Sequence, residues 1–213
     1  MRTLLLLLAL LLPSLSSAAP AAPAAPAVQV QEGDLLFVTA ARTGLSGAIN
    51  EATARADTPS FDHVGLVALA EGGATVLHAD TQGSREQPLP AFLGQARERE
   101  RRVFVYRLVP AQRAAIPAAV ATARSLLGKP YNATYLQSED SLYCSDLIER
   151  AFRADAVFAL QPMNFRNPRT GQMPAYWTAF FARHGMPVPQ GAPGTNPNDM
   201  AASPVLERIG ELR

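Results

Sequence analysis

The chain has 213 residues, of which 48% are hydrophobic and 17% charged, and 19 Lys and Arg against 18 Asp and Glu give a formal net charge of +1. This balance excludes a strongly basic nucleic-acid-binding protein, an acidic tail and disorder along the whole chain. The single cysteine excludes an intramolecular disulfide and a zinc site built from cysteines alone, so its thiol is either a core group or a nucleophile.

The N-terminus has the pattern of an export signal. Arg2 precedes the apolar run 4–12, and small residues follow Pro13. The run has about half the roughly 20 residues that a membrane-spanning helix requires, so we expect a signal peptide over residues 1–18, cleaved after Ala18, and no transmembrane anchor. An uncleaved anchor is the alternative. We therefore expect an exported bacterial protein, either periplasmic or secreted.

One folded domain follows the signal. Residues 19–30 are rich in Ala and Pro, which is typical of a stiff, extended spacer. The remaining residues, 31–213, are enough for one domain with a substantial core and too few for two.

Short apolar runs and turn signals predict a sheet in the first half of this domain. We expect strands at residues 35–39, 64–70, 75–79 and 103–108, with a hairpin turn at 71–73. Helical spacing predicts helices at 44–56, 90–100, 111–127, 142–152 and 175–183. The rest of the Pro-rich segment 161–204 should wrap the domain as ordered loops. Helices at both ends of a hairpin-based sheet imply the α+β class.

The cysteine lies at a predicted helix start. With Ser141 as the N-cap, Cys144 occupies the first turn, where free N–H groups and the helix dipole favour a thiolate and could stabilise an oxyanion. Cys144 also shares a helical face with Leu147, Ile148 and Ala151, as a core residue would. On this segment alone, the core role is the more common one.

Two of the three histidines favour nucleophilic catalysis. His63 stands at the start of one predicted strand and His78 lies on its hairpin partner, so the spacing places them nearly opposite each other. An imidazole–imidazole hydrogen bond would combine a thiol on Cys144, a base and an orienter. Each histidine alone would more often be structural.

Five segments in order are together similar to one family: GDLLF at 33–37, FDHVGLV at 61–67, GKPY at 128–131, YCSDLI at 143–148 and PMNF at 162–165. They resemble the YiiX/YebB-like branch of the NlpC-type hydrolases, which are circularly permuted papain-like cysteine peptidases or amidases. In this family the histidine strand precedes the cysteine helix, as it does here. The resemblance implies a permuted papain-like fold, in which a cysteine-bearing helix packs on an antiparallel sheet.

The resemblance also implies roles for single residues. Cys144 would be the nucleophile, His63 the general base and then acid, and His78 the third group of the triad. Many relatives have a Glu at that third position. A second His there, as in this chain, resembles the related lecithin retinol acyltransferase group. Asp80, on the same side of the strand, is the alternative orienter. Because a neutral His78 should hold the His63 tautomer less strongly than a carboxylate, we expect a higher pH optimum.

Other polar side chains are assigned weaker roles. Tyr131 and Tyr143 flank the helix entrance and could bind substrate or donate to an oxyanion, although packing is their more common role. We expect Asp62 to face solvent and the charged run 97–102 to form a solvated surface. His184 should interact with the end of its helix.

These patterns together predict an exported thiol hydrolase that cleaves an amide or ester bond without a cofactor. Its substrate would be a peptide, an N-acyl amino acid or a lipid-like molecule. We expect no nucleic-acid partner. Acyl transfer through the same covalent intermediate and a non-catalytic binding module on the same fold are the alternatives. A zinc site formed by Cys144, His63, His78 and Asp80 is a further one, although these ligands lack the close spacing of a zinc finger.

Overall fold

The computed structural model describes residues 28–56 and 58–212. The predicted signal peptide, 1–18, and residues 19–27 of the predicted spacer lie outside the described residues. Val28 and Val30 pack against the core, so the packed part of the chain begins earlier than the predicted residue 31. Within the described part, no helix is long and apolar enough to cross a membrane.

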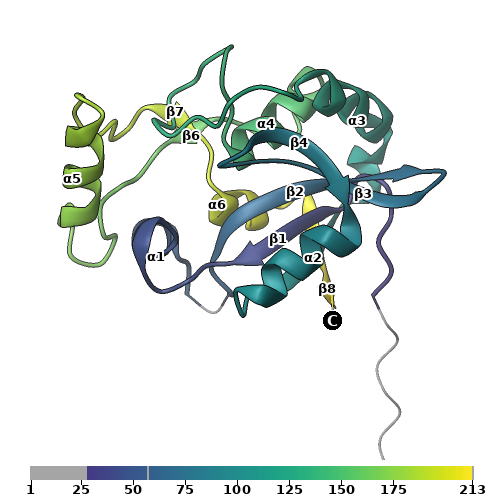
Figure 1. The fold of residues 1–213 in the computed structure, drawn as a ribbon, viewed down its shortest axis with the longest axis horizontal. Coiled ribbons are helices and arrows are strands. Elements are labelled where there is room, and N and C mark those ends of the chain that lie inside the picture. The colour runs from purple at the N-terminus through teal and green to yellow at the C-terminus, as the bar shows by residue number, and fades with distance from the viewer. Residues whose placement is uncertain (1–27, 57, 213) are drawn as a thin grey trace, which may run out of the picture.

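A six-stranded sheet forms the centre of the molecule (Figure 1), in the order β4-β3-β2-β1-β5-β8. Its strands are β1 (Leu35–Thr39), β2 (Phe61–Ala70), β3 (Gly73–Asp80), β4 (Gly83–Pro88), β5 (Val103–Leu108) and β8 (Leu206–Leu212). Every neighbouring pair in it is antiparallel, which confirms the predicted α+β class. The short strands β6 (Gln161–Pro162) and β7 (Pro193–Gly194) pair separately.

Helices lie on both faces of this sheet. The α-helices are α1 (Gly44–Thr53), α2 (Leu89–Glu98), α3 (Ile116–Ser125), α4 (Cys144–Phe152), α5 (Ala175–Arg183) and α6 (Pro197–Ala201). Two 3₁₀ turns, Pro110–Ala115 and Arg153–Asp155, precede α3 and follow α4. The predicted helix 111–127 is thus divided, and Pro117 lies in the first turn of α3, where a missing N–H costs nothing.

Alternation along the strands explains the two layers. Leu35 and Phe37 of β1 point into a core cluster shared with α3 and α4, whereas Leu36 and Val38 point into a second cluster shared with Phe92 of α2. Successive side chains of a strand face opposite sides of its sheet, so a continuous apolar run serves both layers.

A third cluster lies beside the sheet and is largely aromatic. It consists of Ala48, Tyr135, Tyr143, Met163, Phe165, Trp177 and Phe181. These residues come from α1, α5 and the loops around them, and Figure 1 shows α1 and α5 at one end of the molecule. The Pro-rich tail therefore supplies part of the core in addition to surface loops.

Several elements differ from those predicted. The strands β4 (GSREQP) and β8 (LERIGEL) were not predicted, because both are edge strands of mixed polarity without an apolar run. The short helix α6 was also not predicted. The cysteine helix begins at Cys144, and Ser141 is not its N-cap, because Tyr143 is still extended and Leu142 forms a β-bridge with Tyr131.

Candidate active site

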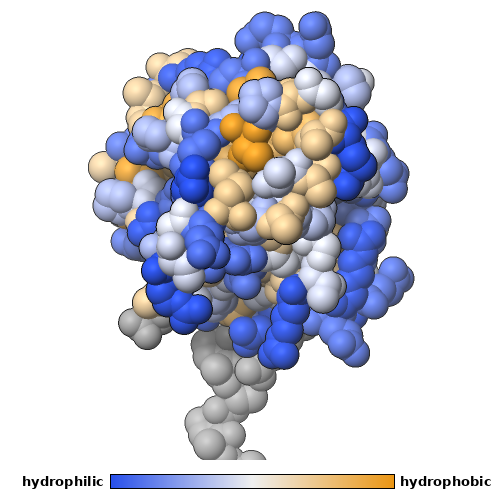
Figure 2. Space-filling model, turned by 90° about the vertical axis from the view of Figure 1, so that its left-hand side faces the viewer, coloured by the Kyte–Doolittle hydropathy of each residue, from blue (hydrophilic) through white to orange (hydrophobic). Residues whose placement is uncertain are grey.

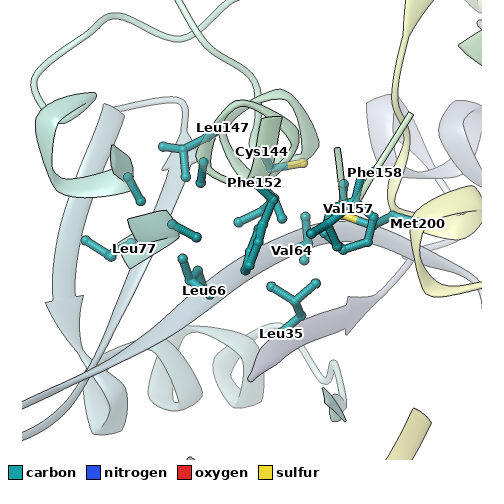
Figure 3. Packing of buried hydrophobic residues seen from close by; sticks show 14 of the residues in the cluster. Leu35, Val64, Leu66, Leu77, Cys144, Leu147, Phe152, Val157, Phe158 and Met200 are labelled. Atoms are coloured by element: carbon teal, nitrogen blue, oxygen red, sulfur yellow. The ribbon is translucent and has the colours of Figure 1, made fainter. Parts of the chain in front are cut away.

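Cys144 is the first residue of α4. The cysteine is 5% exposed and belongs to the first core cluster together with Leu147 and Ile148. Figure 3 shows Cys144 and Leu147 on this helix, with Val64 and Leu66 of β2 beneath them. Both interpretations of the sequence therefore describe real features, since the residue begins a helix and also packs in the core.

The surroundings of the thiol oppose its ionisation. Burial raises the pKa of the Cys144 thiol to about 11, although backbone N–H groups of Val64 and Ser145 favour the thiolate. The lowered pKa that a helix start suggests is thus outweighed by lost hydration. Sγ donates a long hydrogen bond, 3.9 Å, to the carbonyl oxygen of Asp62, the residue before His63. At neutral pH the sulfur is therefore a thiol.

The two histidines form the hydrogen bond that their spacing predicts. His63 Nε2 on β2 and His78 Nδ1 on β3 lie 3.0 Å apart, with their rings at 86° to each other. Continuing the register of β2 and β3 places Gly65 opposite His78. A Cβ on Gly65 would lie 3.3 Å from His78 Cβ and 2.5 Å from Val76 Cγ1. The glycine therefore leaves the space in which His78 reaches diagonally to His63.

The histidine pair is covered by Phe92 of α2. Its ring stacks on His63 with the centroids 5.9 Å apart and meets His78 edge-on at 5.3 Å. Burial lowers the pKa of His63 to about 3 and that of His78 to about 4. Both rings are therefore neutral at pH 7. Because the low pKa keeps His63 neutral well into the acid range, the higher pH optimum expected from the sequence is not supported.

Asp80 is held by partners other than the histidines. Its carboxylate accepts hydrogen bonds from Arg85 at 2.6 Å and from the backbone N–H of Gln82 at 2.9 Å. Asp80 Oδ2 lies 3.9 Å from His78 Nδ1, too far for a hydrogen bond, although its charge opposes the fall in the pKa of His78. The group hydrogen bonded to His63 is therefore His78.

The expectation that Asp62 faces solvent is wrong. The register of β1 and β2 slips by one residue at Asp62, which forms a bulge. Its side chain is 6% exposed and forms an ion pair with Arg101, which is 13% exposed. Arg101 also departs from the solvated surface predicted for 97–102, since its Nε donates to the carbonyl oxygen of Thr39. A buried carboxylate requires such a partner, and the positive charge of Arg101 would interact favourably with the thiolate form of Cys144.

Two cavities near this ion pair share part of their lining. One is lined by His63, His78 and Arg101, and the other opens beside Cys144. Asp62 lines both. In the described part of the chain, the thiol makes no hydrogen bond to the His63 ring and instead contacts the Asp62 carbonyl next to that histidine.

Tyr131 and Tyr143 both line the cavity beside Cys144. The hydroxyl of Tyr143 accepts a hydrogen bond from the N–H of Thr195 at 3.1 Å and lies 3.8 Å from Met163 Sδ. Burial raises the pKa of Tyr143 to about 12 and that of Tyr131 well above its usual value. Both phenols therefore keep their protons over the whole physiological range.

Sequence reasoning missed the apolar wall of this cavity. The wall consists of Ile49, Ala52, Tyr135, Met163, Phe165 and Trp177. Figure 2 shows apolar surface gathered on the end of the molecule that carries α1 and α5. The only signal in the sequence was the helical spacing of 175–183, which predicts a helix and not what it packs against.

The residues proposed above as zinc ligands do not form a metal-binding group. Within residues 28–56 and 58–212, no three His, Cys, Asp or Glu side chains are arranged so that they could hold a metal ion. Asp80 is bound to Arg85, and Cys144 lies in the first core cluster. The donor set therefore does not fit a metal, and no step of the chemistry below involves one.

Comparison with known proteins gives one family and one solved structure. Residues 29–210 match the family described as "Permuted papain-like amidase enzyme, YaeF/YiiX, C92 family". A similar solved structure is that of a protein described as metalloprotein yiiX from Escherichia coli O157:H7, with a TM-score of 0.67 and 22% sequence identity. The match covers 87% of this chain and 100% of that one, and at this identity it shows a shared fold. A search of the curated proteins finds no match.

Proposed function

The chain belongs to the family of permuted papain-like amidases that includes YaeF and YiiX, and we propose that it is an exported amidase that acts through Cys144, His63 and His78. The family makes it a papain-like amidase or cysteine peptidase. The observation that carries the assignment of residues is the 3.0 Å hydrogen bond between two neutral histidines, one residue away from the carbonyl that the thiol contacts.

In the proposed first step, the Cys144 thiol turns from the Asp62 carbonyl towards His63. His63 takes the proton from sulfur as Sγ attacks the carbonyl carbon of the substrate, and the substrate oxygen becomes an oxyanion. Backbone N–H groups at the start of α4 favour negative charge near the sulfur, and they could therefore stabilise this oxyanion. His63 then gives its proton to the leaving nitrogen as the C–N bond breaks. The amine departs, and the acyl group stays on Cys144 as a thioester.

The second step regenerates the enzyme. His63 takes a proton from water as the water oxygen attacks the thioester carbon, and the thiol leaves with that proton as the carboxylic acid forms. Through both steps His78 holds the ring of His63 by its hydrogen bond. His78 accordingly orients the base and never touches the substrate.

The cavity beside Cys144 favours a substrate with an apolar acyl group. Its lining is largely aromatic and aliphatic, with Trp177 and Phe165 among the contributors, whereas the cavity beside His63 is charged. Since His63 protonates the leaving group, the amine half of the substrate would lie on that charged side. Of the substrate classes considered above, this arrangement supports an amide between an apolar acyl group and a polar amine.

Labelling with electrophiles tests the proposal. We expect peptidyl and acyl electrophiles to modify Cys144, an apolar acyl group to react faster than an acidic one, and Cys144→Ser to take up no label. The control His184→Gln removes an exposed histidine at the end of α5 and should label like the native chain. If no probe reacts with Cys144, the chain is a binding module on this fold, and the proposed activity is wrong.

Acyl transfer is the second candidate, favoured by the His at the third position, His78. The same acyl-enzyme would then be attacked by an amine or alcohol instead of water. Adding a series of amines to the reaction separates the two outcomes: hydrolysis predicts free acid at every amine concentration, whereas a transferase converts most of the donor to the new amide.

Export is proposed from the sequence pattern of residues 1–18. Expression of the full chain in a bacterium, followed by N-terminal analysis of the protein from the periplasm or medium, should show that Ala19 is the first residue. Retention of Arg2 in a membrane-bound protein would contradict it.

A further inference from the structure

Two buried nitrogen atoms near the histidine pair lack hydrogen-bond partners within the described residues. They are His78 Nε2 and Gln87 Nε2. Gln87 is 6% exposed and His78 is 1% exposed, so water reaches neither well. A buried polar group without a partner destabilises the fold, so two of them in one place indicate a contact that the side chains can still form.

The register of the sheet brings these two side chains to the same face. On β3 and β4, His78 pairs with Arg85 and Val76 pairs with Gln87. Positions 78 and 87 are therefore diagonal neighbours, within reach of a long side chain. The side chain of Gln87 interacts with the His78 ring and favours its protonated form, which is the effect of an acceptor on a ring N–H.

The orientation of the Gln87 amide, which a rotation by 180° reverses, decides whether His78 Nε2 gains a partner. Oxygen and nitrogen exchange places without a change of shape, and heavy-atom positions alone do not distinguish the two orientations. With Gln87 Oε1 towards the ring, His78 Nε2–H donates to it, and the buried ring nitrogen is no longer unpaired.

We propose that Gln87 is a positioning residue that fixes the direction of the hydrogen bonds through the histidine pair and so makes His63 a base. If Gln87 Oε1 accepts the proton of His78 Nε2, neutral His78 has its lone pair on Nδ1. His63 Nε2 must then donate across the 3.0 Å contact. The lone pair of His63 is left on Nδ1, free to take the proton of the Cys144 thiol.

The opposite orientation of the amide would reverse every bond. Gln87 would donate to His78 Nε2, His78 Nδ1–H would donate to His63 Nε2, and His63 Nδ1 would carry a proton. That tautomer of His63 has no lone pair for a thiol. The charge of Asp80 would favour a proton on His78 Nδ1, but the Asp80 carboxylate is hydrogen bonded to Arg85. The amide of Gln87 therefore determines which tautomer His78 adopts.

The direct test is the tautomer of each histidine, read by ¹⁵N NMR of the full chain carrying Cys144→Ala. We expect Nε2–H and unprotonated Nδ1 on both His63 and His78. A proton on His78 Nδ1 would overturn the proposal. This measurement needs no change at Gln87, so it is independent of whether a Gln87 variant folds, and it needs no substrate.

Variants at Gln87 test the consequence, which rests on the proposed function. Gln87→Met removes the acceptor, so kcat should fall by about tenfold to a hundredfold with KM unchanged. Gln87→Glu keeps an acceptor towards the ring and should restore most of kcat, while its charge raises the pKa of His63 and moves the acid limb of the pH profile to higher pH. Gln112→Met makes the same substitution on the 3₁₀ turn Pro110–Ala115 and should change neither.

The two failures are distinguishable. If the native chain shows no activity on any acyl probe but both histidines are Nε2–H tautomers, the proposed function is wrong and the assignment of Gln87 stands. If the native chain is active and Gln87→Met keeps the native kcat and pH profile, the assignment of Gln87 is wrong and the function stands.

Discussion

The histidine half and the thiol half of the site are built in different ways. His63 and His78 come from adjacent strands of one hairpin, 15 residues apart, and a single hydrogen bond joins them. Cys144 begins a helix, and its cavity is completed by residues from α1, a loop at 131–135 and the tail 163–197. The first half depends on local register, and the second on packing between distant segments. The two halves meet at Asp62, which contributes to both cavities.

The largest expected effect comes from removing His63, the proposed base on the sheet. His63→Gln should lower kcat by about 10²–10⁴-fold, the usual contribution of a general base, while the chain remains folded. Steady-state kinetics against His184→Gln as the matched control would measure it. Comparable rates in the two variants would mean that the histidine half takes no part in the reaction.

The same two histidines should make the protein sensitive to mild acid. In the folded chain the pKa values are about 3 for His63 and about 4 for His78, against about 6.5 when unfolded. A lowered pKa in the folded state means that stability is complete above pH 6.5 and is lost as the pH falls. At pH 5.5, one unit below the ordinary pKa, the two groups together should cost about 3 kcal/mol of stability.

Denaturant titrations at pH 7.5 and 5.5 would measure that cost. The variant His63→Gln with His78→Gln should lose most of the difference, and His184→Gln should keep it. An equal pH dependence in the double variant and the native chain would show that other groups cause it.

Gly65→Ala is a smaller change, confined to the histidine half of the site. The added Cβ would meet Val76 Cγ1 at 2.5 Å and His78 Cβ at 3.3 Å, so we expect a loss of about 1–3 kcal/mol in unfolding free energy and a weakened histidine contact. Gly94→Ala on α2 meets nothing within 4 Å and should be neutral or stabilise the chain. If both variants behave alike in stability and kcat, the space at Gly65 has no importance for the pair.

The smallest effect belongs to the thiol half. Tyr143→Phe removes the acceptor for Thr195 N–H and should cost about 1 kcal/mol of stability, with Cys144 still open to labelling. Thermal unfolding and labelling rates would check this. A loss of labelling as complete as that of Cys144→Ser would show that the phenol takes part in the chemistry.

The sequence predicts the histidine half of the site better than the thiol half. The hairpin contact was predictable, because its turn and the positions of His63 and His78 lie within one short segment. The aromatic wall was not, since Trp177 and Phe165 read as helix and loop with no indication of their partners. Asp62 was misjudged because a bulge reverses the direction that simple alternation assigns to its side chain. Gln87 lies on a polar edge strand that has no recognisable pattern.

The central claim is that Cys144 carries the acyl group during the reaction and that His63 makes this possible. Rapid-quench mass spectrometry with an activated donor of an apolar acyl group tests it most directly. We predict that the peptide containing Cys144 gains the acyl mass within one turnover, that His63→Gln accumulates it far more slowly, and that Cys144→Ser never gains it. Product formation without any acylated Cys144, or equal acylation rates with and without His63, would contradict the account.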